Sequence, residues 1–319
     1  MLTVFLQAKL FPLEFVSCIL LALIPAVAWL WIFLGKHPEK KGPVSLAFFF
    51  GMLSAALVLA YQASWGDSFN FVYIKVESVN FQENVKGIVQ HSLLASFCIF
   101  LSVGFMEEVA KHYAVVQADK NIFESVDDVI ELSIVSALGF AFLENIGYFF
   151  MLVVHGQGDQ LFATFLMRSI FVVFIHVLCS GIYGAFYGMG FFAKPYMSRK
   201  IQMGKTFYIA EFFHRIFHFR KAAVFHERMM IEGVVIASVL HGIYDFLLET
   251  NMTIFGKPLF MYGLPIYLVG GYWYLSSVLE KKENHERFGH LVVKEEYTEK
   301  EDEEEEKVPV RMKNAFETA

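Results

Sequence analysis

Long apolar runs are the feature that most restricts how this chain can fold. A helix needs roughly 20 apolar residues to cross the ~30 Å hydrocarbon core of a bilayer, and in lipid it satisfies its own backbone hydrogen bonds. Seven such runs are found at Leu13–Leu34, Val44–Ala63, His91–Val116, Val129–Val154, Leu161–Ala193, Met229–Glu249 and Leu259–Leu279. With 56% hydrophobic residues over 319 positions, the pattern predicts an all-α, polytopic transmembrane helical bundle of about seven spans.

The positive charges between the runs predict the orientation, because short translocated loops are poor in lysine and arginine. Lysines and arginines concentrate in the segments 36–41, 199–221 and 281–282, and the alternate loops carry few of them. An N-out, C-in arrangement satisfies this distribution, with the plasma (inner) membrane as the expected location. The three cysteines lie inside apolar runs, so a disulfide framework is not expected.

The apolar pattern divides the chain into a membrane domain, residues 1–280, and a charged cytosolic tail, residues 281–319. The tail contains the acidic block 301–306, and a block of like charges repels itself, which predicts disorder. Between the fifth and sixth runs, residues 198–228 mix phenylalanines with arginines, lysines and histidines. That mixture predicts an amphipathic cytosolic insert on anionic lipid. The charge distribution does not indicate nucleic-acid binding.

Polar side chains inside the apolar runs identify a candidate site, because each is costly at membrane depth and needs a partner or a water-filled cavity. They are Glu107, Glu108 and Lys111 on the third run, Glu144 and Asn145 on the fourth, His176 on the fifth, and His241 and Asp245 on the sixth. Taken singly, each is explained by a register-fixing ion pair or an interhelical hydrogen bond. When four helices each place such a residue at membrane depth, the total energetic cost is larger than fixing the helix register requires. The pattern therefore predicts a shared functional site.

These residues resemble, in order, the motifs of the PrsW family of intramembrane proteases. The motifs read Glu107-Glu108-x-x-Lys111, Phe140-x-x-x-Glu144-Asn145, His176 and His241-x-x-x-Asp245. The family is more distantly related to the CAAX-processing proteases and to the Aph-1 subunit of γ-secretase. The resemblance covers about residues 90–280. It implies an endopeptidase that cleaves a single-span membrane protein, such as an anti-sigma factor in stress signalling. At the positions where this chain has Glu144 and Asp245, the motifs of the CAAX enzymes differ. The resemblance therefore does not imply that their mechanism transfers directly.

Peptide hydrolysis needs an activated water, a donor to the oxyanion and a proton for the leaving amine. One of Glu107 and Glu108 is expected to pair with Lys111 and the other to face the water, and the likeness to the CAAX enzymes implies Glu107 as the base. Two arrangements stay open at this point. In the metal-free one, Glu107 and Glu144 share the water, and His176, His241 or Asn145 stabilises the oxyanion. In the other, Glu144, His176, His241 and Asp245 bind a zinc-like divalent ion.

Two other classes of function are compatible with the pattern. A non-catalytic scaffold resembling Aph-1 uses intramembrane histidines to hold helices together, although it has less need of carboxylates. A proton-coupled transporter relays protons through Glu, Asp and His, although such proteins usually show repeated halves and broken helices. The intramembrane protease is the prediction that the combined motifs favour.

Overall fold

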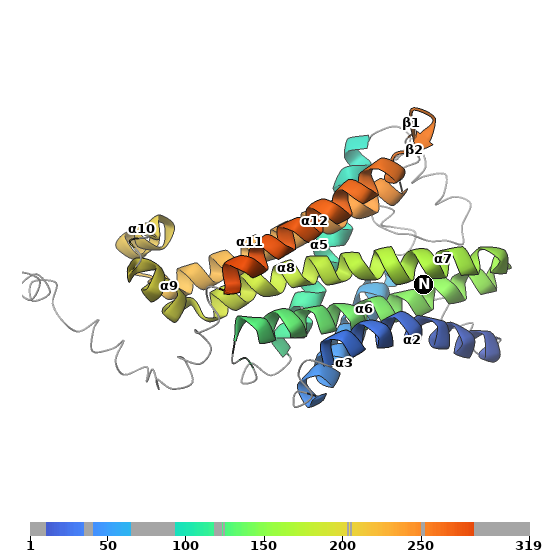
Figure 1. Cartoon of the computed structure of the whole chain (residues 1–319), viewed down its shortest axis with the longest axis horizontal. Helices are drawn as coiled ribbons and strands as arrows, with labels where there is room; N and C mark the ends of the chain where they lie inside the picture. The colour runs from blue at the N-terminus through green and yellow to red at the C-terminus, as the bar shows by residue number, and fades with distance from the viewer. Residues whose placement is uncertain are drawn as a thin grey trace, which may run out of the picture.

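The structure is a computed structural model that describes residues 11–34, 41–64, 93–117, 123, 125–202, 204, 206–249 and 253–283. The described part is helical apart from one short hairpin (Figure 1). The long helices are α2 (Pro12–Leu34), α3 (Lys41–Ser64), α5 (Leu93–Gln117), α6 (Val126–Val154), α8 (Val173–Phe191), α11 (Lys221–Glu249) and α12 (Phe260–Glu283). The shorter elements are η4 (Gly158–Gln160), α7 (Leu161–Met167), η5 (Arg168–Val172), α9 (Ala193–Gln202), α10 (Tyr208–Phe217), β1 (Thr253–Ile254) and β2 (Lys257–Pro258).

Long helices occupy all seven predicted places. Five segments are long and apolar enough to cross a membrane: Pro12–Trp31, Gly42–Ala60, Val126–Val154, Gly158–Phe191 and Lys221–Leu248. The other two helices are α5, which carries the charged triplet, and α12. The helical fold is therefore confirmed, while the count of seven spans and the N-out, C-in orientation stay predictions. The expected charged tail, residues 281–319, lies almost entirely outside the described residues.

Helix α6 is the centre of the bundle. It packs against α2, α3, α5 and α8, and its phenylalanines Phe140, Phe149 and Phe150 are almost fully buried. The helix begins with a capping box, in which the Ser125 hydroxyl accepts from the Asp128 amide and the Asp128 carboxylate accepts from the Ser125 amide. These two bonds satisfy backbone donors that a helix leaves free at its start.

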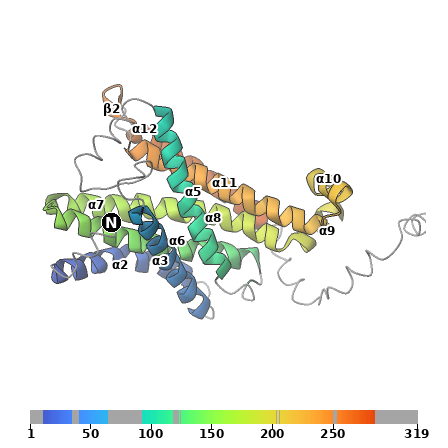
Figure 2. The ribbon, with the colours of Figure 1, turned by 180° about the vertical axis from the view of Figure 1, so that it is seen from behind.

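Glycines allow the helices around α6 to approach closely. A Cβ atom on Gly184 of α8 would lie 2.8 Å from the Cα of Ile130 on α6. On α5, a Cβ on Gly104 would lie 2.8 Å from the amide nitrogen of Gly242 on α11. Gly184 and Gly104 therefore lie at helix crossings, where small residues let two helices approach closely. Seen from behind, α5 crosses α11, α8 and α6 steeply (Figure 2).

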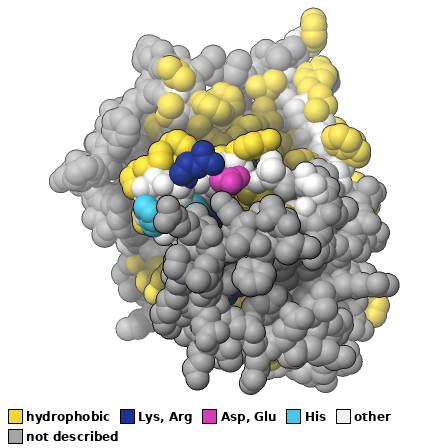
Figure 3. Space-filling model, turned by 90° about the vertical axis from the view of Figure 1, so that its left-hand side faces the viewer, with side chains coloured by type: hydrophobic (Ala, Val, Ile, Leu, Met, Phe, Trp, Pro, Cys, Tyr) yellow, Lys and Arg dark blue, Asp and Glu magenta, His cyan; other side chains and the backbone are white. Residues whose placement is uncertain are grey.

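The predicted amphipathic insert contains α9 and α10, at the end of α8 and the beginning of α11 (Figure 1). Several of its apolar side chains are exposed, among them Tyr208, Phe212, Ile216 and Phe217. The view onto this end of the molecule shows hydrophobic side chains beside a small group of charged ones (Figure 3). That surface has the composition of an interfacial helix, and its placement on the cytosolic side stays a prediction.

Candidate active site

Polar side chains from five helical segments meet where α5 crosses the bundle. They are Glu107, Glu108 and Lys111 of α5, Glu144 and Asn145 of α6, Arg168 of η5, His176 of α8, and His241 and Asp245 of α11. The structure thus brings together the eight residues that the sequence pattern selected, and it adds Arg168. The Gly104–Gly242 crossing explains the arrangement, because Glu107 and Glu108 follow Gly104 by one turn and His241 precedes Gly242 directly.

The two ends of this cluster come from different depths along their helices. In the predicted orientation, Glu107 lies in the inner half of its span and Asp245 in the outer half. Helix α5 crosses α11 steeply (Figure 2), while the depth of each residue in the bilayer stays a prediction. His241 Nε2 lies 3.5 Å from Glu107 Oε2 and 3.7 Å from Asp245 Oδ2, so one imidazole contacts both carboxylates.

Glu108 is the glutamate that Lys111 holds. The Lys111 ammonium donates to Glu108 Oε1 at 2.8 Å, and the His241 Nδ1–H donates to the same oxygen at 2.8 Å. The ammonium also lies 4.4 Å from the centroid of the Phe140 ring, within cation–π range. The prediction that one glutamate pairs with Lys111 is therefore confirmed, and the contact across to α11 selects Glu108.

Glu107 is held less firmly. Its Oε2 is buried without a hydrogen-bond partner and lies 3.7 Å from Lys111 Nζ. Because His241 donates through Nδ1, a neutral imidazole turns the lone pair of Nε2 toward the oxygens of Glu107 and Asp245. Three acceptor atoms that face one another need a cation between them, either a proton on Nε2 or a metal ion.

His176 also has a carboxylate on one ring nitrogen. An ammonium has donors only, so the 2.8 Å contact with Lys111 Nζ makes Nδ1 of His176 the acceptor. The ring hydrogen then lies on Nε2, which donates to Glu144 Oε2 at 3.2 Å. The His176 and His241 rings are perpendicular, with centroids 5.1 Å apart. Both imidazoles are thus oriented by a glutamate, as metal-binding histidines usually are.

Arg168 is the site residue that the sequence analysis missed. Its Nε donates to Asn145 Oδ1 at 2.6 Å, its Nη2 donates to Glu144 Oε2 at 2.8 Å, and its guanidinium lies 3.7 Å from the centroid of the Tyr148 ring. It is the first residue of η5, a π-helical turn, and such turns are frequent at functional sites. The signal was present in the sequence, because an arginine inside an apolar run is as costly as the glutamates that were selected.

The metal-ligand set differs from the one that the sequence suggested. Among the described residues, Glu107, His176 and His241 each offer a ligand atom within 4.8 Å of the others. The sequence pattern indicated Glu144, His176, His241 and Asp245. In the structure, however, Glu144 is bound by Arg168, and Asp245, whose side chain is 23% exposed, lies 3.7 Å from His241 Nε2 at the edge of the cluster. Two nitrogens and a carboxylate oxygen form a donor set that zinc accepts, so the residues present fit a divalent ion.

The ammonium of Lys111 contacts His176 Nδ1, the nitrogen that would bind the ion. An ion on that nitrogen leaves Lys111 its 2.8 Å bond to Glu108 and its 3.7 Å contact with Glu107. Lys111 therefore keeps two anionic partners when His176 is a ligand.

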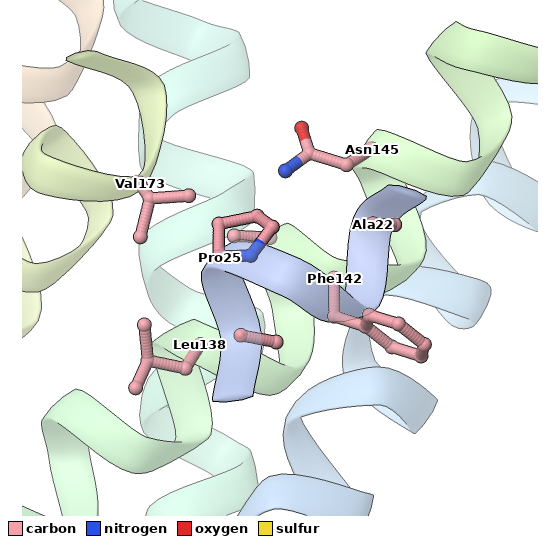
Figure 4. A pocket seen from close by; sticks show the side chains of 8 residues that line it. Ala22, Pro25, Leu138, Phe142, Asn145 and Val173 are labelled. Carbon is pink, nitrogen blue, oxygen red and sulfur yellow. The ribbon is translucent and has the colours of Figure 1, made fainter. Parts of the chain in front are cut away.

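Asn145 has its amide nitrogen in a recess of the bundle (Figure 4). The recess is lined by Ala22, Pro25, Ala26, Leu138, Ala141, Phe142, Asn145 and Val173, and Asn145 Nδ2 has no hydrogen-bond partner there. Its oxygen is committed to Arg168. Asn145 therefore acts on the cluster through Arg168.

Comparison with protein families identifies a match over most of the chain. The sequence model described as the PrsW family intramembrane metalloprotease matches residues 39–272. The match begins well before residue 90, so it includes α3, which the resemblance seen in the sequence did not cover. No curated protein and no solved structure matches the chain.

Proposed function

The chain belongs to the PrsW family of intramembrane proteases, and from this premise we propose that the polar cluster is the active site, with Glu107, His176 and His241 as ligands of a divalent ion. One observation carries the proposal: ligand atoms of these three buried residues lie within 4.8 Å of one another, and Glu107 Oε2 has no hydrogen-bond partner. When bound, such an ion supplies a Lewis acid that polarises a peptide carbonyl and activates a water.

The balance of charge supports a divalent ion. Four carboxylates belong to the cluster, from Glu107, Glu108, Glu144 and Asp245, against the permanent cations Lys111 and Arg168. Two formal negative charges remain, and uncompensated charge at low dielectric is strongly unfavourable. A divalent ion neutralises both.

The remaining residues keep the ligands in place. Glu108 fixes the His241 ring through Nδ1, and Glu144 fixes the His176 ring through Nε2. Lys111 and Arg168 in turn hold these two glutamates at 2.8 Å. Each histidine is thus oriented by a carboxylate that has its own cation, which is the usual second layer of a metal site.

Asp245 is the carboxylate placed to handle the protons of the reaction. Its side chain is 23% exposed, against 9% for Glu107, 2% for Glu108 and 14% for Glu144, so water reaches it most easily. In the proposed reaction, Asp245 accepts a proton from the water whose oxygen bonds to the peptide carbon. It returns that proton to the nitrogen when the C–N bond breaks.

The substrate that this site suits is a membrane protein with a single span. The cluster lies inside an integral membrane protein, so the cleaved bond must enter the helical bundle from the bilayer. An anti-sigma factor released in a stress response, in the plasma membrane, is the specific substrate that the resemblance to the family implies. The protease domain extends over residues 1–280 in this proposal, and residues 281–319 form a cytosolic tail.

The proposal is tested by measuring bound metal and cleavage together. Wild type and Glu107→Gln are purified in detergent, their metal content is determined by mass spectrometry, and both are incubated with a panel of single-span membrane proteins. Wild type is expected to hold about one divalent ion per chain and to lose cleavage after chelation. Glu107→Gln is expected to lose both. The matched control is Glu232→Gln, an exposed carboxylate of α11 that is paired with Arg228, which should change neither.

Each contrary result has a distinct meaning. Full cleavage by metal-free wild type would eliminate the ion and restore the arrangement in which Glu107 and Glu144 share the water. Full metal content in an inactive Glu107→Gln would make Glu107 the base and remove it from the ligand set. Absence of fragments from every substrate, with folded wild type, would contradict the assignment of the cluster as an active site.

A further inference from the structure

The phenol of Tyr244 is buried beside the cluster without a hydrogen-bond partner. The residue is 3% exposed, and its hydroxyl is among the buried polar atoms that lack a partner. It follows His241 by three residues on α11 and therefore lies on the same side of the helix as His241. A buried hydroxyl without a partner is costly, which suggests that the bound substrate provides one.

The surroundings of Tyr244 belong to the site. Its hydroxyl lies within electrostatic range of Arg168, Asp245 and Glu144, which come from three different helical segments. Its ring packs against Tyr267 of α12, with centroids 6.1 Å apart. The ring is therefore anchored between α11 and α12, and the hydroxyl interacts electrostatically with the charges of the cluster.

Most other donors of the site are already committed. Lys111 donates to Glu108 and, until an ion takes that nitrogen, to His176; Arg168 donates to Glu144 and Asn145, and the two histidines donate to glutamates. The amide nitrogen of Asn145 lies in the recess near α2 (Figure 4).

Two buried serines near the histidines, Ser180 and Ser238, also have hydroxyls without a partner. A serine in a helix can turn its hydroxyl to a backbone carbonyl of the preceding turn. The rigid phenol of Tyr244 cannot reach its own backbone in that way. Tyr244, like its neighbour Tyr267 on α12, therefore needs a partner from outside its own helix, and of the two only Tyr244 lies on the helix that carries His241 and Asp245.

We propose that the Tyr244 hydroxyl donates a hydrogen bond to the carbonyl oxygen of the scissile peptide bond. This inference rests on the proposed function of the cluster. When the water oxygen bonds to the peptide carbon, the carbonyl oxygen gains negative charge and its hydrogen bond to Tyr244 strengthens. Tyr244 keeps its proton throughout. The proton that leaves the water goes to Asp245 and then to the departing amine.

The test is the substitution Tyr244→Phe, which deletes the hydroxyl and keeps the ring. We expect kcat for a substrate cleaved by wild type to fall by about 10²-fold, the usual effect of removing one oxyanion donor, with KM changed less than about twofold. Metal content stays at the wild-type value. The melting temperature stays equal or rises, because a buried hydroxyl without a partner has been removed. The matched control is Tyr187→Phe, another buried tyrosine, on α8 among aromatic rings, which should leave kcat unchanged.

Wild-type kcat in Tyr244→Phe would overturn the inference and leave the proposed function intact. A lowered melting temperature with lost metal would also overturn it, because it would show that the hydroxyl serves folding. If metal-loaded wild type cleaves no substrate, the proposed function fails and the inference fails with it. The three outcomes differ in wild-type activity and in the metal content of the variant, so they are distinguishable.

Discussion

Replacing Arg168 with methionine removes the cation that faces Glu144 and keeps much of the apolar side chain. The substitution deletes the bonds of 2.8 Å to Glu144 and 2.6 Å to Asn145 and the contact with the Tyr148 ring. Glu144 then keeps His176 as a neighbour but loses its closest cation. Removing one partner of a buried ion pair costs about 3–5 kcal/mol, because the other charge stays buried. We therefore expect the free energy of unfolding to fall by about 4 kcal/mol.

A double-mutant cycle with Glu144→Gln separates the pair from the rest of this loss. Glu144→Gln alone leaves Arg168 buried with one amide partner and is expected to cost about 3 kcal/mol. The double variant has no uncompensated charge, so it should lose only about 4 kcal/mol in total and not the sum of the two single losses. The expected coupling energy is then about 3 kcal/mol. Unfolding is followed by denaturant titration in detergent, with chelator in every sample so that metal binding does not contribute.

A coupling energy below about 0.5 kcal/mol would refute this reasoning, since independent sites add to within that margin. Arg168→Lys is the informative control. Lysine keeps the positive charge but lacks the planar fork that reaches Glu144 and Asn145 together. It should therefore lose less stability than Arg168→Met, and an equal loss would show that charge is not what Arg168 contributes.

Two further substitutions test the packing that positions the site. Gly242→Ala places a Cβ atom 2.7 Å from the Cα of Leu101 on α5, so we expect α5 and α11 to move apart. The free energy of unfolding, measured by thermal unfolding, should fall by about 2 kcal/mol, and bound metal should be lost. Gly270→Ala on α12, where nothing lies within 4 Å of the added Cβ, should instead stabilise by about 0.5–1 kcal/mol, and equal effects at the two glycines would contradict the crossing. Ser125→Ala deletes the hydroxyl that caps α6 and should cost about 1 kcal/mol with activity retained, whereas Ser125→Asp should be nearly neutral.

The helices were predictable because apolar runs of membrane length allow little else, but their ends were not. Helix α11 begins at Lys221, eight residues before the predicted run at Met229. The added turns contain His226, Glu227 and Arg228, which are helical but polar. Apolar length marks the part of a helix that suits lipid, whereas capping and loop contacts decide where the helix ends. The start of α6 at Val126 shows the same effect, since Ser125 supplies its cap.

The membership of the site was largely predictable from the cost of polar residues at membrane depth, whereas its internal pairing was not. Lys111 lies one turn from both Glu107 and Glu108, so spacing along α5 could not choose between them. The choice follows from His241, which lies on another helix and donates to Glu108. Arg168 escaped prediction although it obeys the same rule as the glutamates. It lies in the apolar run 161–193 without a charged neighbour at helical spacing, and its partners Glu144 and Asn145 are on α6.

The close crossing of α5 and α11 links the fold to the chemistry. A Cβ on Gly104 would lie 2.8 Å from the Gly242 amide nitrogen, and larger residues there would hold the two helix axes farther apart. His241 could then not reach Glu108 at 2.8 Å, and Nε2 could not face Glu107 at 3.5 Å. Glu107 and Glu108 would still contact Lys111, but Glu107 would lose its contact with His241 Nε2, and with it the proposed cation site. Small residues in these helices are therefore part of the site, because they set the distance at which its charged groups meet.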